Sequence, residues 1–198
     1  MCVLLEAAAK TASTLTSLDM SYCDLSSAPP AMLARAGAQL VRAALPGTRL
    51  TAAQLSALLS RPPALALDLS GLPALASLPA PALASLASLQ QLRVANTGLK
   101  PDQITVLLAP ASRLVQLDLS CLNLSSLSAS LLATAVSALH TVDLTAARLQ
   151  AAQLTALLDR VVQGAGPARL CLTANSLTRV QPGLVSRARL NTATQLKM

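Results

Sequence analysis

The chain has 198 residues, of which 53% are hydrophobic and only 12% charged, and its 15 basic and 8 acidic side chains give a net charge of +7. It contains one histidine, one tyrosine, no phenylalanine and no tryptophan. The lone histidine excludes a multi-histidine metal site, and the lack of aromatic side chains argues against a surface on which nucleic-acid bases stack.

From Leu15 onward, a short phrase recurs seven times, reading leucine-x-x-leucine-x-leucine with close variants. Apolar and polar residues alternate within it, as in Leu15-x-x-Leu18-x-Met20. This alternation predicts a short half-buried strand, with Leu18 and Met20 pointing inward and Asp19 outward. The strands recur every 24 to 28 residues and are centred on Leu18, Ala43, Leu67, Leu92, Leu117, Val142 and Leu170.

Segments typical of helices follow these strands, most clearly at residues 52–59 and 151–158. Their apolar positions recur three and four residues apart among good helix formers. Because a strand and helix of this length cannot bury their own apolar face, neighbouring units must stack. The predicted fold is an α/β solenoid of about seven repeats, with a parallel sheet on the concave side and short helices on the convex side.

With seven phrases in register, the whole chain resembles the leucine-rich repeat family. Residues 75–94 resemble the repeats of extracellular receptors and adhesion proteins, with Leu83 where that class usually has phenylalanine. Residues 52–59 and 151–158 resemble the ribonuclease-inhibitor type instead. The resemblance implies a non-catalytic protein-binding scaffold and leaves the subfamily open.

The two ends predict an excerpt of a longer solenoid. We expect a single domain over residues 1–198, in which residues 1–14 form a partial first repeat and residues 193–198 form a truncated eighth strand. Neither end carries the polar cap that a solenoid needs, so further repeats or a second copy of the chain are expected there. The alternative is an intact small protein that frays or dimerises at its ends.

Residues 69–89 carry no charge, yet they do not predict a membrane span. Pro73, Pro79 and Pro81 interrupt the segment, and its leucines keep the repeat register. The N-terminus also lacks the basic leader and long apolar run of a secretion signal.

The outward strand position between the two apolar residues forms the candidate binding surface. Four of the eight acidic residues occupy it, and Arg93 fills it in one repeat. Such carboxylates could hold arginine or lysine side chains of a protein ligand, although aspartate also suits a solvent-facing strand position. The predicted concave-face binding residues are Asp19, Asp68, Arg93, Asp118 and Asp143.

The basic excess gathers late in the chain, where every charged residue after Asp159 is basic. This could be a basic end that meets an acidic neighbour, or simply a solvated surface. Because the predicted concave face is mixed in sign and lacks aromatic side chains, we expect a protein partner and no nucleic acid.

Nothing in the sequence predicts an enzyme, a metal site or a cofactor. His140 has no second histidine, and the cysteines show no Cys-x-x-Cys spacing. The glycines are scattered and form no phosphate-binding loop. We therefore expect no catalytic residues, no metal ligands and no cofactors.

One motif points outside the cell, because Asn123-Leu124-Ser125 is an acceptor sequence for N-glycosylation. The cysteine pattern suits a reducing compartment instead. We predict a fragment of a receptor or adhesion-type ectodomain that binds a protein ligand on its concave face, at the cell surface or outside the cell. The alternative is an intracellular adaptor that recruits a basic protein.

Overall fold

The computed structural model describes residues 15–109, 113–190 and 195–198. Its sheet has eight strands, all parallel and arranged in the order of the sequence. The strands are β1 (Ser17–Asp19), β2 (Arg42–Ala44), β3 (Ala66–Asp68), β4 (Gln91–Arg93), β5 (Gln116–Asp118), β6 (Thr141–Asp143), β7 (Arg169–Cys171) and β8 (Gln195–Lys197).

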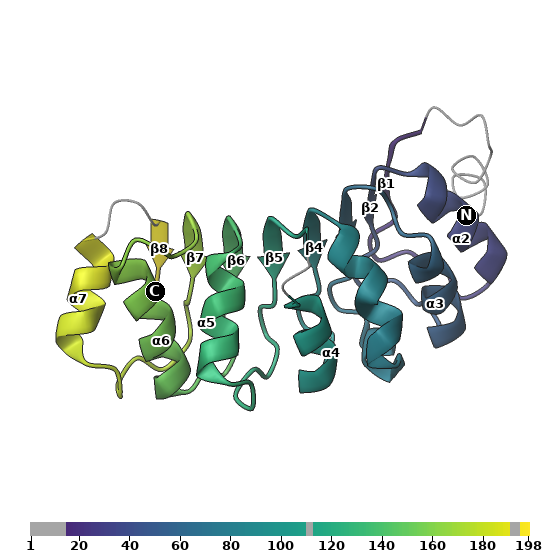
Figure 1. Ribbon diagram of the computed structural model, residues 1–198. Coiled ribbons are helices and arrows are strands. Elements are labelled where there is room, and N and C mark those ends of the chain that lie inside the picture. Colours follow the sequence, from purple (N-terminus) through teal and green to yellow (C-terminus); the bar gives the residue numbers. More distant parts are fainter. Residues whose placement is uncertain (1–14, 110–112, 191–194) are drawn as a thin grey trace.

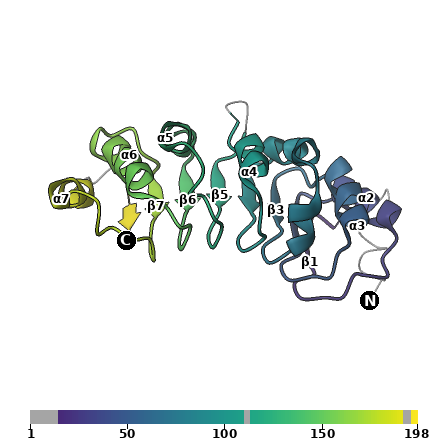
Figure 2. The same ribbon diagram turned by 90° about the horizontal axis from the view of Figure 1, so that it is seen from below.

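The helices lie in a second layer that covers one face of this sheet and leaves the other bare (Figures 1 and 2). They lie on the outer side of the gentle arc that the chain describes in Figure 2. They are α2 (Pro30–Gln39), α3 (Ala52–Ser60), α4 (Pro101–Leu107), α5 (Ala129–Ser137), α6 (Ala151–Val162) and α7 (Pro182–Leu190), with the 3-10 helices η1 (Pro73–Ser77) and η2 (Ala80–Ser88) between β3 and β4. The predicted solenoid, its strands and the helices at residues 52–59 and 151–158 are confirmed.

A single leucine-rich core runs lengthwise between the two layers. The central residue of each of the first seven strands is buried, from Leu18 to Leu170. The large leucines of the middle repeats, such as Leu69, Leu83 and Leu144, are fully inaccessible to solvent. Leucine side chains therefore supply the packing that phenylalanine would otherwise provide.

Two kinds of repeat alternate along the chain. In the first kind, a turn separates the last loop leucine from the helix, as between Leu25 and Pro30. In the second kind the helix follows that leucine almost at once, as between Leu50 and Ala52. The helices of the first kind are α2, η2, α5 and α7, and those of the second kind are α3, α4 and α6. The helix-containing repeats thus differ in a regular order along the chain.

A buried glutamine joins each repeat of the second kind to the repeat before it. In α3, the Gln54 amide nitrogen donates to the backbone oxygens of Leu25 (2.8 Å) and Ala28 (2.7 Å), and its amide oxygen accepts from the Thr51 N–H (2.8 Å). Gln103 and Gln153 repeat the arrangement. We call these three contacts the glutamine bridges.

The turn after each of the first seven strands requires a left-handed backbone. The residue at one equivalent position of this turn has a positive φ in all seven repeats, and it is glycine in only two of them. An L-residue in this conformation costs roughly 1–2 kcal/mol. The residues are Tyr22, Gly47, Gly71, Asn96, Cys121, Ala146 and Ala174.

Candidate functional site

The bare face of the sheet brings the predicted site residues into one row. The strand register aligns the position that follows each central residue, so that Asp118 lies opposite Asp143 on the neighbouring strand. Neighbouring parallel strands are about 4.8 Å apart. From β1 to β8 the row reads Asp19, Ala44, Asp68, Arg93, Asp118, Asp143, Cys171 and Lys197. We call its four aspartates the Asp column.

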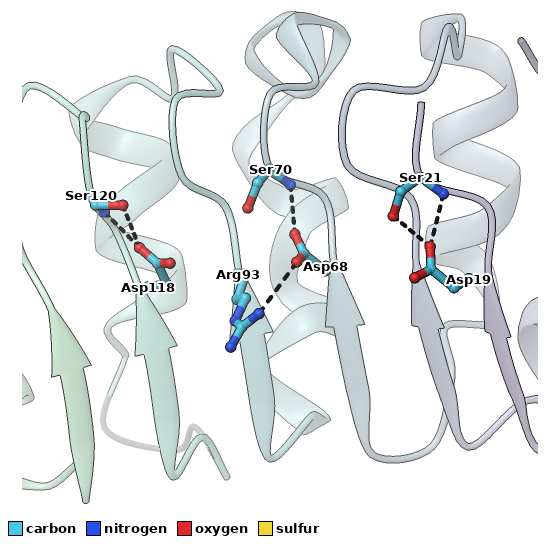
Figure 3. Close-up of polar contacts among 7 residues, drawn as sticks. All are labelled: Asp19, Ser21, Asp68, Ser70, Arg93, Asp118 and Ser120. Carbon is cyan, nitrogen blue, oxygen red and sulfur yellow. Dashed lines mark hydrogen bonds and ion pairs between the residues drawn. The ribbon is translucent and has the colours of Figure 1, made fainter. Parts of the chain in front are cut away.

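Each aspartate of the Asp column is held in one orientation by the turn that follows its strand. The Oδ1 atom of Asp68 accepts a hydrogen bond from the Ser70 N–H (3.0 Å), and that of Asp143 accepts from the Thr145 N–H (2.8 Å). Asp19 and Asp118 accept the same bond from the serine two residues on, together with that serine's hydroxyl (Figure 3). The carboxylates are therefore fixed before any partner arrives.

This bond gives the aspartates a structural role as well. All four stand in the pattern Asp-x-Ser or Asp-x-Thr, whereas Ala44 and Arg93 are followed two residues later by proline and alanine. A carboxylate at this position closes the turn by accepting a backbone N–H that has no partner in the sheet. These turn bonds use the Oδ1 atom of each carboxylate and do not involve its Oδ2 atom.

The Oδ2 atom of Asp68 has a partner in Arg93 on the next strand. The Arg93 Nη1 atom lies 3.7 Å from it (Figure 3), and the arginine side chain is 68% exposed. At this exposure the ion pair contributes little to stability. Arg93 thus sits between Asp68 and Asp118 in the row and makes its ion pair with Asp68.

Hydrogen bonding lowers the pKa of one aspartate of the Asp column, Asp19. The Ser21 hydroxyl and the Ser21 N–H both donate to Asp19 and hold the pKa of its carboxyl below the ordinary value of 3.8. Ser26 acts in the same way on Asp24, and lowers the pKa of that carboxyl. Both groups are therefore ionised at neutral pH.

A second row of side chains runs beside the Asp column and completes the surface. It carries Arg42, Gln91, Gln116 and Arg169, and the Arg169 Nε atom donates to Gln195 (2.8 Å). The two rows line a shallow hollow of about 470 Å³ over β1 to β6. Its charged rim is mixed in sign, as the sequence predicted.

The histidine and the cysteine nearest to this face can be placed relative to the Asp column. His140 is exposed and precedes β6, away from the Asp column. Cys171 lies in the row, where its sulfur is 3.1 Å from the Thr145 hydroxyl and 3.4 Å from the Thr173 hydroxyl. Within residues 15–109, 113–190 and 195–198, no group of three or more potential ligands could hold a metal ion. No described helix is long and apolar enough to cross a membrane.

The predicted glycosylation site lies on an exposed turn beyond β5. The Oδ1 atom of Asn123 accepts from the Ser125 hydroxyl (2.7 Å) and the Ser125 N–H (3.2 Å). Asp24 and Ser26 make the matching backbone contact at the same point of the first described repeat. Asn123 therefore closes its turn, whether or not it also carries a glycan.

Sequence reasoning missed the glutamine bridges. Their signal is present in the sequence, because Gln54, Gln103 and Gln153 each begin the pattern Gln-Leu/Ile-x-x-Leu-Leu. These three glutamines are 1–3% exposed, although glutamine is seldom buried. A polar residue that recurs on the apolar face of every second helix was the available clue.

These features together define the architecture of a leucine-rich repeat solenoid. No family model matches the chain, and no curated protein matches it. Among solved structures, the chain is similar to the leucine-rich repeat-containing protein LegL7 from Legionella pneumophila, with 21% sequence identity and a TM-score of 0.47. The similarity covers 87% of this chain and 71% of that one.

Proposed function

We propose that this protein is a non-catalytic scaffold that binds a protein ligand on the bare face of its sheet. The observation that carries the proposal is the fixed orientation of the Asp column, in which one carboxylate oxygen is held by the turn. A carboxylate that is already oriented loses little conformational freedom when it binds a cationic side chain. The ligand accordingly presents arginine or lysine side chains to this face.

Charge complementarity supports a basic ligand. The chain as a whole has a net charge of +7, yet the Asp column concentrates four of its eight acidic residues on one face. Asp118 and Asp143 are neighbours in the row, and Arg93 makes its ion pair with Asp68. The Asp118 and Asp143 pair is therefore the point at which a cationic side chain gains most.

Photo-crosslinking tests the location of the binding face. A benzoylphenylalanine in place of Gln91 lines the hollow on the sheet, whereas the same residue in place of Ser56 is exposed on α3 on the opposite face. We expect a protein adduct from position 91 and none of the same mass from position 56. An adduct that forms only from position 56 would contradict the proposal.

We further propose that the scaffold is part of a receptor or adhesion-type ectodomain, a proposal that the sequence Asn123-Leu124-Ser125 supports. An immunoblot of the endogenous protein with and without N-glycosidase tests this assignment. A band that shifts to lower mass supports it. A band that does not shift, from a protein found in the cytosol, would favour the intracellular adaptor.

A further inference from the structure

Tyr22 is the only aromatic residue of the chain, and the fold leaves it 83% exposed. It follows β1 in the turn that the Ser21 N–H closes by donating to Asp19 (2.9 Å). Its φ is 59°, a left-handed conformation that is uncommon for a bulky side chain. The other six residues at this turn position are glycine, asparagine, cysteine or alanine. A large aromatic side chain thus lies at the rim of the bare face, outside the hydrophobic core.

The Tyr22 ring lies against Gly47, in the turn of the next repeat. A Cβ atom at Gly47 would lie 2.6 Å from the Tyr22 Cδ1 atom and 2.7 Å from its Cε1 atom, so the ring edge occupies space that any other residue there would fill. Because Gly47 follows β2, the side chain extends toward the later repeats and away from the N-terminal edge of the sheet. The ring is therefore supported at one edge and accessible to a ligand on the bare face.

Asp19 places a negative charge three residues from this ring. The residue opposite it on β2 is Ala44, whereas Asp68 lies opposite Arg93 and pairs with it (3.7 Å). The bonds from Ser21 use the Oδ1 atom of Asp19 and hold the pKa of its carboxyl below 3.8, so the carboxylate is ionised at neutral pH. One turn thus presents both an exposed aromatic ring and an oriented anion.

We propose that Tyr22 and Asp19 bind one arginine side chain of the protein ligand, with its guanidinium group stacked on the ring and paired with the carboxylate. The guanidinium group is planar, so it can stack on an aromatic face while its N–H groups donate to a carboxylate. A lysine ammonium group has no such flat surface, and the pair therefore selects arginine. This inference rests on the proposed function and adds a residue that the ligand carries.

The fluorescence of Tyr22 tests the subsite directly, because the chain has no other aromatic residue. The probe is the peptide acetyl-Gly-Arg-Gly-amide in low salt, and the controls carry lysine or citrulline, the uncharged analogue of arginine. We expect a saturable fluorescence change with the arginine peptide, at least threefold weaker binding of the lysine peptide and no saturation with citrulline. No saturation by the arginine peptide at millimolar concentration, or equal binding of it and either control, would overturn the proposal.

Charge variants show whether the peptide binds at Asp19. Asp19→Asn keeps an oxygen that accepts the Ser21 N–H and removes the charge, so we expect it to weaken binding of the arginine peptide at least threefold. Asp102→Asn changes the net charge by the same amount on the exposed first turn of α4, and should leave binding unchanged. Equal losses in the two variants would overturn the proposal, because the peptide would then respond only to net charge.

The adduct from a benzoylphenylalanine at position 91 tests the subsite with the protein ligand itself. Tyr22→Leu should reduce this adduct at least threefold, whereas Tyr22→Phe keeps the ring and should preserve it. An adduct that Tyr22→Leu leaves undiminished would overturn the arginine subsite and leave the proposed binding face intact. If the unmodified face gives no adduct, the proposed function is wrong, and the peptide titration decides the arginine subsite by itself.

Discussion

At the left-handed turn positions, the choice between alanine and glycine affects the stability of the folded chain. Ala146 has a φ of 53° in a turn where Gly71 has a φ of 69° in another repeat. Glycine adopts this conformation without steric cost, whereas alanine does not. The same turn is thus built at different cost in different repeats.

Replacement of Ala146 by glycine should therefore stabilise the protein by up to about 1 kcal/mol. Urea unfolding measures the change as a shift of the midpoint at constant slope. As the control, Ala156→Gly lies within α6, where glycine should cost about 1 kcal/mol. A loss of stability in both variants would show that the turn at Ala146 is not strained.

The charge on Asp19 makes stability depend on pH in a defined direction. Hydrogen bonds from Ser21 lower its pKa in the folded protein below 3.8. Its contribution is therefore fully present above the unfolded value and is lost as the pH falls through the lowered folded pKa. In an NMR titration, the side-chain carboxyl carbon of Asp19 should have its midpoint below 3.8, and Ser21→Ala should raise that midpoint. A midpoint at or above 3.8 in the unmodified protein would be inconsistent with these bonds.

At the scale of the helix and the turn, the glutamine bridges are side-chain contacts that join one repeat to the next. Gln103 makes its shortest contact with the Leu78 oxygen (2.6 Å) and also accepts the Lys100 N–H (2.7 Å). Removing a buried partner costs more than a hydrogen bond contributes, because the group left behind stays unsatisfied. Each bridge therefore joins two successive repeats at a point where no backbone ladder runs.

Gln103→Leu should lower the free energy of unfolding by roughly 2–4 kcal/mol, since it leaves the Leu78 oxygen and the Lys100 N–H without partners. Denaturant unfolding provides the measurement. Gln39→Leu, at the exposed end of α2, is the matched control and should change stability by less than about 0.5 kcal/mol. Equal effects of the two substitutions would mean that the bridge contributes nothing specific.

The strands and helices could be predicted from the sequence, but the bridges could not. The alternation around Leu18 and the apolar spacing around Leu55 follow directly from local geometry, so both elements appear as expected. The contact between Gln54 and Leu25 instead depends on how two repeats stack, and period alone does not determine that. The same limit applies to Asp68 and Arg93, whose row was predicted while their ion pair was not.

At the scale of the whole molecule, the glutamine bridges join the repeats in pairs, which we call two-repeat units. Within the units α2 packs on α3, η2 on α4, and α5 on α6. Between α4 and α5 lies an apolar pocket of about 590 Å³, lined by Leu107, Leu114 and Leu131 among others. An apolar pocket thus lies at the boundary between these two units.

Repeat proteins open in segments when the interfaces between neighbours differ in strength. In native-state hydrogen exchange with added urea, α5 and α6 should therefore share one opening free energy that differs from that of η2 and α4. The bridge from Gln153 to Leu124 and Leu127 joins the repeats of α5 and α6. The bridge from Gln103 to Leu78 joins the repeats of η2 and α4. A single opening free energy for all four helices would argue against two-repeat units.

The central claim is that the outward carboxylates of the sheet bind a basic protein ligand. The most direct test is the triple variant Asp68→Asn, Asp118→Asn and Asp143→Asn, because the asparagine oxygen still accepts the bond that closes each turn while the charge is removed. The adduct formed by a benzoylphenylalanine at position 91 is measured in both backgrounds. We predict that the adduct falls by tenfold or more while the thermal midpoint of unfolding stays within a few degrees. An undiminished adduct in the triple variant would contradict the claim.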